Sequence, residues 1–271
     1  MSSSCSNSSA KLMIIPAAGY GTRMQILTFG KSKELIEVGG VPAIMYALNE
    51  AYNAGITHVG IIIRKGKEDI LRFINNDSRM DSLREALQIK FFYQINPTGE
   101  VGAILTAADW IGDHSFAVHY PDNIVLNPFG ILSEFLKHQA ELKTDTVLLT
   151  NLLEGAQTPL CDLELVDHNL YRLTFGNSPE SFSYGLRPTG VYIATPFFIR
   201  SGIELLQDGN VHEIKDMDVR RLLALKGNEV HGINLNASVL DVGNPAGYQL
   251  AESILNLPLE QGSCVTKQSN T

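Results

Sequence analysis

The sequence predicts an α/β fold with a doubly wound, mostly parallel (mixed) sheet of the Rossmann-like kind. Three observations predict it: apolar runs recur along the chain, amphipathic segments separate them, and small residues follow the first run directly. That run, Leu12–Pro16, leads into Ala17-Ala18-Gly19-Tyr20-Gly21. Glycines let the backbone approach a ligand closely, and successive N–H groups can surround an anion. We therefore expect a ligand loop at the end of the first strand.

In the first half of the chain, strands and helices are expected to alternate. Apolar runs bounded by turn residues predict strands, and apolar residues at a spacing of three or four predict helices. The expected strands are 12–16, 58–64, 90–94, 115–120 and 146–152, and the expected helices are 42–55, 67–74, 99–110 and 129–142. This order is typical of repeated βαβ units and a parallel sheet.

After residue 152 the alternation changes. Segments 162–166 and 170–174 flank Asp167-His168-Asn169 as in a β-hairpin. Strands 190–194, 230–235 and 238–241 are expected to close the sheet, with helices at 197–206, 218–225 and 245–255. No internal repeat and no linker rich in Pro, Gly or Ser divides the chain. We expect one domain over 11–260, with halves of about 11–150 and 151–260, and disordered tails at 1–10 and 261–271.

Composition narrows the class of protein. The chain has 271 residues, 44% of them hydrophobic, and a formal net charge of −8. An acidic chain argues against a nucleic-acid surface, and no apolar run is long enough for a membrane span. Ser2 to Ser9 lacks the apolar core of a secretory signal. Cys5, Cys161 and Cys264 have no CxxC or metal-ligand spacing. We expect a reduced, cytoplasmic protein with no nucleic-acid or membrane partner.

The glycine loop and two cations after it indicate a polyphosphate ligand. Arg23 and Lys33 could neutralise charge that backbone dipoles alone cannot. The loop is not a Walker A motif, because no Gly-Lys-Ser/Thr follows. It is not a dinucleotide fingerprint either, since Met24 stands at the third glycine position and Arg64 and Lys65 follow the second strand where an acid is expected. The alternative at this point is a β-to-α turn with no ligand.

Two aspartates end strands far apart in the sequence, Asp122 and Asp241. Ligands of a doubly wound sheet gather at the carboxyl ends of its strands. Paired carboxylates near a triphosphate suit Mg²⁺, which takes one or two protein carboxylates and shares its other positions with phosphate and water. The alternative is an ordinary turn, since Asp commonly follows a strand.

Several motifs in order resemble those of sugar-1-phosphate nucleotidylyltransferases, the family of glucose-1-phosphate uridylyltransferase and thymidylyltransferase. The resemblance runs from about residue 12 to 255. The matching motifs are Gly19-Tyr20-Gly21-Thr22-Arg23, Ser32-Lys33-Glu34-Leu35-Ile36 with Gly39-Gly40-Val41-Pro42, Gln94 with Gly99, Asp122-Asn123, and Asp241-Val242-Gly243-Asn244-Pro245. The resemblance implies a nucleotide half, an acceptor-binding lobe in the second half, and an enzyme of nucleotide-sugar biosynthesis.

The resemblance also implies roles for particular residues. Arg23 and Lys33 would be catalytic, gripping the triphosphate. The nucleotide would be bound by Ala17, Ala18, Gly19, Gly21, Thr22, Gln94 and Gly99. Asp122 and Asp241 would hold Mg²⁺. Gln94 can both donate and accept, which favours UTP or dTTP over purine nucleotides. The acceptor would be a sugar-1-phosphate or sugar-like phosphate, with pyrophosphate released. We further expect a homo-oligomer.

The second half departs from the family pattern. The stretch 173–179 lacks the Glu-Lys-Pro whose lysine grips the sugar phosphate. We expect Arg187 to replace it, with Tyr184 facing the sugar; Arg172, Lys215 and Arg220 are further candidates. Three functions stay open: an active nucleotidylyltransferase with an unusual acceptor, an inactive nucleotide-sugar-binding regulatory subunit, or an unrelated nucleotide enzyme such as an oxidoreductase. The missing third glycine disfavours the last.

Overall fold

The computed structural model describes residues 11–126, 130–151, 160–176, 183–208 and 213–256. The expected tails at 1–10 and 261–271, with Cys5 and Cys264, lie outside these residues, and so does part of the stretch 173–179. Among the described residues no helix is both long and apolar enough to cross a membrane.

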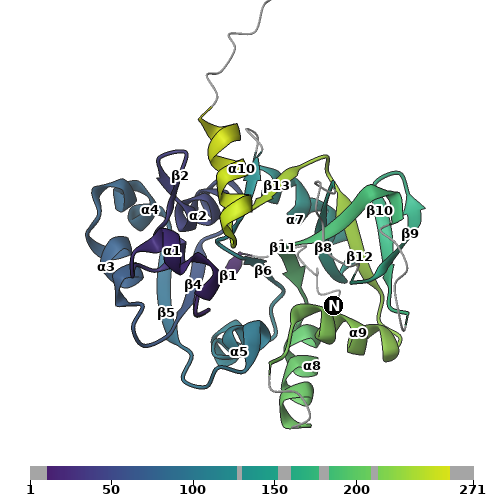
Figure 1. Cartoon of the computed structure of the whole chain (residues 1–271). Coiled ribbons are helices and arrows are strands. Elements are labelled where there is room, and N and C mark those ends of the chain that lie inside the picture. The colour runs from purple at the N-terminus through teal and green to yellow at the C-terminus, as the bar shows by residue number, and fades with distance from the viewer. Residues whose placement is uncertain (1–10, 127–129, 152–159, 177–182, 209–212, 257–271) are drawn as a thin grey trace, which may run out of the picture.

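The centre of the molecule is a nine-stranded sheet in the order β5-β4-β1-β6-β11-β8-β12-β10-β9 (Figure 1). Its strands are β1 (Leu12–Pro16), β4 (His58–Ile63), β5 (Gln88–Tyr93), β6 (Phe116–His119), β8 (Asp145–Asn151), β9 (Asp162–Asp167), β10 (Leu170–Thr174), β11 (Leu186–Ala194) and β12 (Val230–Asn234). The first-half strands β5, β4, β1 and β6 are parallel. Strand β11 is antiparallel to both β6 and β8, so it joins the two halves. The doubly wound, mixed sheet is confirmed.

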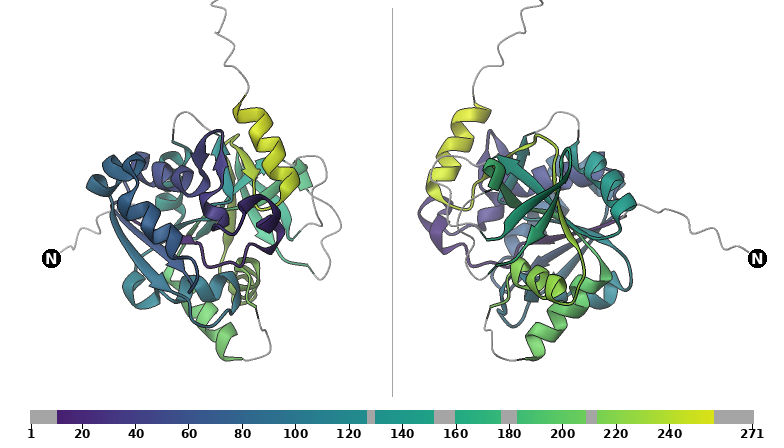
Figure 2. Two further views of the ribbon diagram at one scale, coloured as in Figure 1. Left: turned by 60° about the vertical axis from the view of Figure 1, so that its left-hand side comes forward. Right: turned by 90° about the vertical axis from the view of Figure 1, so that its right-hand side faces the viewer.

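Helices cover both faces of the sheet (Figure 2), and the alternation of strand side chains explains how. Met13 and Ile15 of β1 belong to one hydrophobic cluster, and Ile14 belongs to the other. The first cluster contains α2 (Ala43–Asn53), α3 (Glu68–Asn76), α4 (Asp81–Ala86) and α7 (Ile131–Leu142). The second contains α5 (Gly99–Leu105), α6 (Ala108–Ile111), α8 (Pro196–Gln207) and α9 (Asp216–Leu225).

Two expectations about elements were wrong. The helix expected over 99–110 is two helices, because the chain turns at Thr106 and Ala107, whose N–H groups bond three residues back. Strand β13 (Ser238–Asp241) does not close the main sheet. It pairs with β7 (Asn123–Leu126), a strand that the sequence analysis missed. Helix α10 (Pro245–Leu255) follows with the expected bounds.

The pairing of β7 with β13 has a direct consequence for the two aspartates. Asp241 lies opposite Asn123, the neighbour of Asp122, and the N–H of Val242 donates to the carbonyl of Asp122 at 2.8 Å. Short elements complete the chain: η1 (Thr22–Met24), α1 (Gln25–Thr28), η2 (Lys33–Leu35), β2 (Glu37–Val38), β3 (Val41–Pro42), η3 (Ser78–Met80) and η4 (Ser183–Gly185).

Candidate active site

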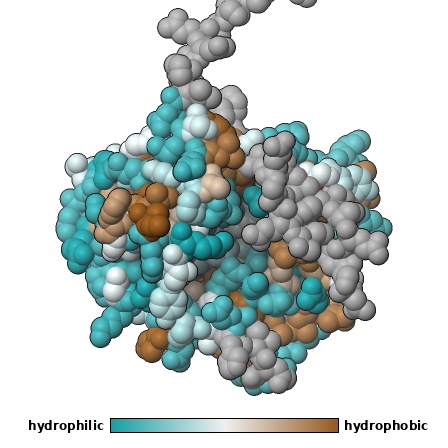
Figure 3. Space-filling model, in the orientation of Figure 1, coloured by the Kyte–Doolittle hydropathy of each residue, from teal (hydrophilic) through white to brown (hydrophobic). Residues whose placement is uncertain are grey.

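A cleft of about 970 Å³ lies at the carboxyl ends of β1, β4, β5 and β6. It is lined by most of the residues that the sequence singled out: Ala18, Gly19, Gly21, Thr22, Arg23, Lys33, Gln94, Gly99, Asp122 and Asp241. The face of the molecule drawn in Figure 3 is mostly hydrophilic, and hydrophobic residues form only small patches on it. The topology thus gathers these distant residues around one space, as expected for a ligand site of a doubly wound sheet.

The glycine loop and its cations line the cleft at the carboxyl end of β1. Gly21 has φ +65°, and a Cβ there would touch the methylenes of Lys33 at 3.4 Å. A Cβ placed on Gly19 would have no heavy atom within 4 Å, apart from Gly19 itself and its two neighbours in the chain. The backbone of Gly19 is therefore open to a ligand. Arg23 is exposed beside the cleft. Backbone and cations together suit a chain of phosphates.

Two further cations, Arg64 and Lys65, also line the cleft. The sequence analysis named them only as evidence against a dinucleotide fingerprint and assigned them no ligand. They follow β4 directly, and the guanidinium of Arg64 lies over the ring of Tyr20 in the glycine loop, 4.3 Å from its centroid. Their place at a strand end was the signal that could have identified them.

Lys33 and Asp122 form an ion pair inside the cleft. Burial would lower the pKa of Lys33, but Asp122, Glu34 and Asp241 together raise it. Burial opposes ionisation of Asp122, but the lysine and the amide of Asn123 hold the pKa of this carboxyl below its usual range. Both groups are therefore charged at neutral pH.

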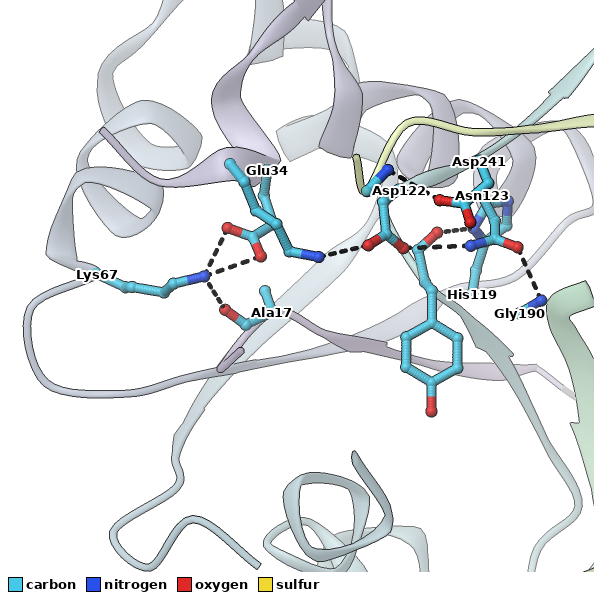
Figure 4. A network of polar contacts seen from close by, with 11 residues as sticks. Ala17, Glu34, Lys67, His119, Asp122, Asn123, Gly190 and Asp241 are labelled. Atoms are coloured by element: carbon cyan, nitrogen blue, oxygen red, sulfur yellow. Dashed lines mark hydrogen bonds and ion pairs between the residues drawn. The ribbon is translucent and has the colours of Figure 1, made fainter. Parts of the chain in front are cut away.

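Asp122 and Asp241 face the same point (Figure 4). A Cβ placed on Gly243 would lie 2.8 Å from Oδ2 of Asp122 and 3.0 Å from Oδ1 of Asp241. The N–H of Gly243 donates to that same Oδ1 at 2.9 Å. Asn123 fixes Asp122 from the other side, donating to its Oδ1 at 3.2 Å and accepting from the N–H of Gly190 at 2.9 Å. The arrangement is a pair of oriented carboxylates beside a residue without a side chain.

These carboxylates fit Mg²⁺ by the chemistry of their donors. Among the described residues, no group of three or more His, Cys, Asp and Glu side chains could hold a metal ion. Two hard oxygen donors, with phosphate and water supplying the rest, is the usual arrangement for this ion. His119 lies close by, but burial lowers its pKa to about 4, and it is neutral.

Gln94, which follows β5 directly, and Gly99 meet in the same cleft. The Nε2 of Gln94 donates to the carbonyl of Gly99 at 3.2 Å. The backbone N–H of Gln94 donates to the carbonyl of Ile63 at 2.8 Å. Gly99 has φ +86°, and a Cβ there would lie 2.6 Å from the backbone nitrogen of Ile214. The position admits only glycine. Because Gly99 is held in this way, the Gln94 carboxamide and the Gly99 carbonyl together present a fixed polar edge to the cleft.

Ala17 is placed differently from the expectation. It is fully buried and does not line the cleft. Its N–H donates to Ile62 at 2.8 Å, and its carbonyl accepts from the ammonium of Lys67 at 2.8 Å. Both backbone groups of Ala17 are therefore bonded within the protein, and they fix the start of the glycine loop.

The comparison with known proteins follows this geometry. A family model described as nucleotidyl transferase matches residues 12–158, more than half of the chain. The chain belongs to the nucleotidyl transferase family. The match confirms the resemblance drawn from the motifs, and it covers the half that carries the glycine loop, Lys33, Gln94 and Asp122.

Relatives of this nucleotidyl transferase have consistent names. A UTP–glucose-1-phosphate uridylyltransferase from Pseudomonas aeruginosa is 28% identical over 261 residues, covering 88% of this chain and 93% of the relative. A glucose-1-phosphate thymidylyltransferase from Streptomyces griseus is 24% identical, covering 85% and 62%. A crystal structure of UDP-glucose pyrophosphorylase complexed with UDP-glucose superposes with a TM-score of 0.77 at 24% identity, covering 90% of this chain and 98% of that one. The last likeness confirms the fold.

The lining of the cleft in this nucleotidyl transferase includes a group of opposite charges, which come from both the matched half and the chain beyond it. The group consists of Glu100, Asp216 and Lys215. The N–H of Asp216 donates to Oε1 of Glu100 at 3.3 Å. Burial, and then the charge of Asp216, raises the pKa of Glu100 to about 7. Arg220 is fully buried behind them, bonded to Asp216 at 2.6 Å and stacked over Tyr192.

The expected acceptor residues do not line this cleft. Arg187 lies on β11 opposite Thr150, and Tyr184 is 58% exposed, with its ring edge against Tyr171. Arg172 is paired on the surface with Glu164 and Glu229. Of the four cations weighed for the acceptor phosphate, only Lys215 lines the cleft.

Proposed function

We propose that this nucleotidyl transferase uses Mg²⁺ to transfer a uridylyl or thymidylyl group from UTP or dTTP to a sugar-1-phosphate or sugar-like phosphate, releasing pyrophosphate. The observation that carries the proposal is that Lys33, Asp122 and Asp241 converge beside the glycine loop, in the same cleft as Gln94 and Gly99. The names of the uridylyltransferase and thymidylyltransferase relatives support it.

The reaction needs positioning and charge more than a base. An oxygen of the acceptor phosphate attacks the α-phosphorus and forms a new P–O bond, while the bond to the β-phosphate breaks and pyrophosphate leaves. A phosphate monoester is already anionic at neutral pH, so no strong general base is required. Arg23 and Lys33 would stabilise the charge on the phosphates as it shifts.

The ion pair of Lys33 with Asp122 gives these residues two roles. Asp122 and Asp241 would hold Mg²⁺, which supplies Lewis-acid stabilisation of the phosphates when bound. With Asp122 engaged by a metal ion, the ammonium of Lys33 would be released toward the triphosphate.

The base end of the cleft favours a pyrimidine. The carboxamide of Gln94, together with the backbone of Gly99, offers both donor and acceptor groups, which complement the O4/N3 or O2/N3 edge of uracil or thymine. At the acceptor end we propose Lys215 as the phosphate-binding cation in place of the missing family lysine. A cytoplasmic homo-oligomer stays a prediction.

Pyrophosphate release tests the function. The purified protein is incubated with Mg²⁺, each of UTP, dTTP, CTP, ATP and GTP, and a panel of sugar-1-phosphates and related phosphates. We expect turnover with UTP or dTTP to exceed turnover with ATP or GTP by at least about tenfold, the effect of one lost pair of base contacts. Equal turnover of purine and pyrimidine nucleotides would contradict the base assignment. Binding of nucleotide or nucleotide sugar without any turnover would favour the regulatory alternative.

A further inference from the structure

One short segment holds both sequence neighbours of Lys33. Asp69, in the first turn of α3, accepts from the N–H of Ser32 at 2.8 Å and from its hydroxyl at 2.6 Å. Lys67, just before α3, donates to both carboxylate oxygens of Glu34 at 2.7 and 2.8 Å. Lys33 lies between two anchored residues, and its own side chain forms the ion pair with Asp122.

The ammonium of Lys67 has a third partner, the carbonyl of Ala17 at 2.8 Å. An ammonium has three N–H groups and no acceptor, so its bonding capacity is filled. The Lys67 and Glu34 side chains are only 4% and 1% exposed. One buried cation therefore joins the end of β1, where the glycine loop begins, to the turn that carries Lys33.

The charges in this arrangement also affect where the ammonium of Lys33 lies. Two lysines act on the charge of the buried Glu34: Lys67, which binds both of its oxygens, and Lys33, its neighbour in the sequence. A buried carboxylate that lost Lys67 would be left without its ion-pair partner, which proteins avoid at high cost. Lys33 is the adjacent cation in the sequence and the nearest replacement. Its ammonium would then be drawn from the cleft toward Glu34.

We propose that Lys67 is a positioning residue for nucleotidyl transfer: by occupying both oxygens of Glu34 it keeps Lys33 directed into the cleft, and by binding the carbonyl of Ala17 it sets the glycine loop. The proposal rests on the proposed role of Lys33 in binding the triphosphate. It assigns a function to a residue that makes no contact with the cleft and that no motif identified.

The decisive experiment is a double-mutant series. Lys67→Met should lower kcat/KM for UTP by about 10²-fold, the effect expected when a catalytic group is displaced by about 1 Å. Adding Glu34→Gln removes the charge that competes for Lys33, so the double variant should recover at least about tenfold of that loss. A purely structural role predicts the reverse, since losing both partners removes more contacts than losing one. Arg72→Met, on the exposed side of the same helix, is the matched control and should behave as wild type.

Nucleotide binding separates this proposal from the proposed function. Calorimetric titration with Mg²⁺ and UTP should show the dissociation constant raised at least about tenfold in Lys67→Met and lowered again in the double variant, whether or not an acceptor is turned over. A wild type that binds UTP but has no turnover would contradict the proposed function alone. A folded Lys67→Met variant within about threefold of wild type, or a double variant no better than the single one, would overturn the positioning role.

A second variant covers the case in which Lys67→Met does not fold. Ser32→Ala removes the hydroxyl bond to Asp69 and leaves the backbone bond in place. It should keep the melting temperature close to wild type while reducing kcat/KM for UTP about fivefold, as one lost hydrogen bond would. Unchanged kinetics in Ser32→Ala would then count against the anchoring of Lys33 by this segment.

Discussion

At the scale of single residues, we predict for Asp241 a chemical role that is separable from folding. Its side chain is partly exposed at the end of β13, and the contact that the structure gives it is with the N–H of Gly243. An asparagine could keep that contact through its carbonyl oxygen but would remove the charge. Substitution of this residue therefore tests the proposed metal site without disturbing the fold.

Asp241→Asn should lower kcat by about 10²-fold or more, since one charged group at a phosphoryl-transfer site is worth at least as much as one oxyanion donor. Its melting temperature should change little, because a partly exposed substitution usually costs under about 0.5 kcal/mol. Kinetics at saturating Mg²⁺ and thermal unfolding measure the two effects. Asp113→Asn on the surface is the control, and equal losses of activity in both variants would contradict the assignment.

The acceptor cation is the second prediction at this scale. Lys215 lines the cleft and Arg187 does not, so the two give a matched comparison. Lys215→Ala should raise KM for the phosphorylated acceptor about tenfold and leave KM for the nucleotide unchanged, because a charge-assisted contact to phosphate is worth about 1.5–3 kcal/mol. Arg187→Ala should leave both unchanged. Steady-state kinetics with one substrate varied at a time decide, and the opposite result would restore Arg187 as the phosphate ligand.

At the scale of elements, the first turn of α5 holds a carboxyl group, that of Glu100, away from water. Glu100 lies in the first turn, where the helix dipole favours a negative charge, yet burial and Asp216 raise its pKa to about 7. Because its pKa is higher in the folded state than in the unfolded state, the folded protein binds the proton more tightly. The contribution of this group to stability is present below about pH 4.5 and is lost as the pH rises through about 7.

Glu100→Gln should therefore stabilise the protein relative to wild type by about 2–3 kcal/mol more at pH 8 than at pH 4.5, from about 1.4 kcal/mol for each unit of pKa shift. Urea unfolding at the two pH values measures the difference. Glu85→Gln, at an exposed position in α4, should show no such change. A difference between wild type and Glu100→Gln that is the same at both pH values would show that Glu100 ionises normally.

The elements also show what the sequence could predict. Strand β1 and helix α10 were predicted with their bounds, because the apolar run ends at a proline in one and Asn-Pro begins the other. The short strand β7 was missed, since four residues carry little periodicity. The lining of the cleft was predicted wherever a motif marked it. Lys67 and Asp69 were not, because their function depends on contacts with Glu34 and Ser32 that no spacing along the chain reveals.

At the scale of the whole molecule, the sheet unites two halves that differ in how well they match the family. The family model ends at residue 158, and the chain beyond it contributes Lys215, Asp216 and Asp241 to the cleft, whereas Glu100 comes from the matched half. We predict that the nucleotide contacts come mostly from the matched half and the acceptor contacts mostly from the chain beyond it. On that prediction, divergence in the second half would change the acceptor without disturbing Lys33, Gln94 or the glycine loop.

Strand β11 lies between β6 and β8 in the middle of the sheet, although it comes much later in the chain than either. A fragment of residues 11–151 would therefore hold β6 with one side unpaired and β8 with neither neighbour, and such free edges recruit other chains. Expressed alone it should aggregate, as light scattering would show, and supplying residues 160–256 in trans should restore solubility. Where the chain is cut between β8 and β11, the first half is left as a template for association.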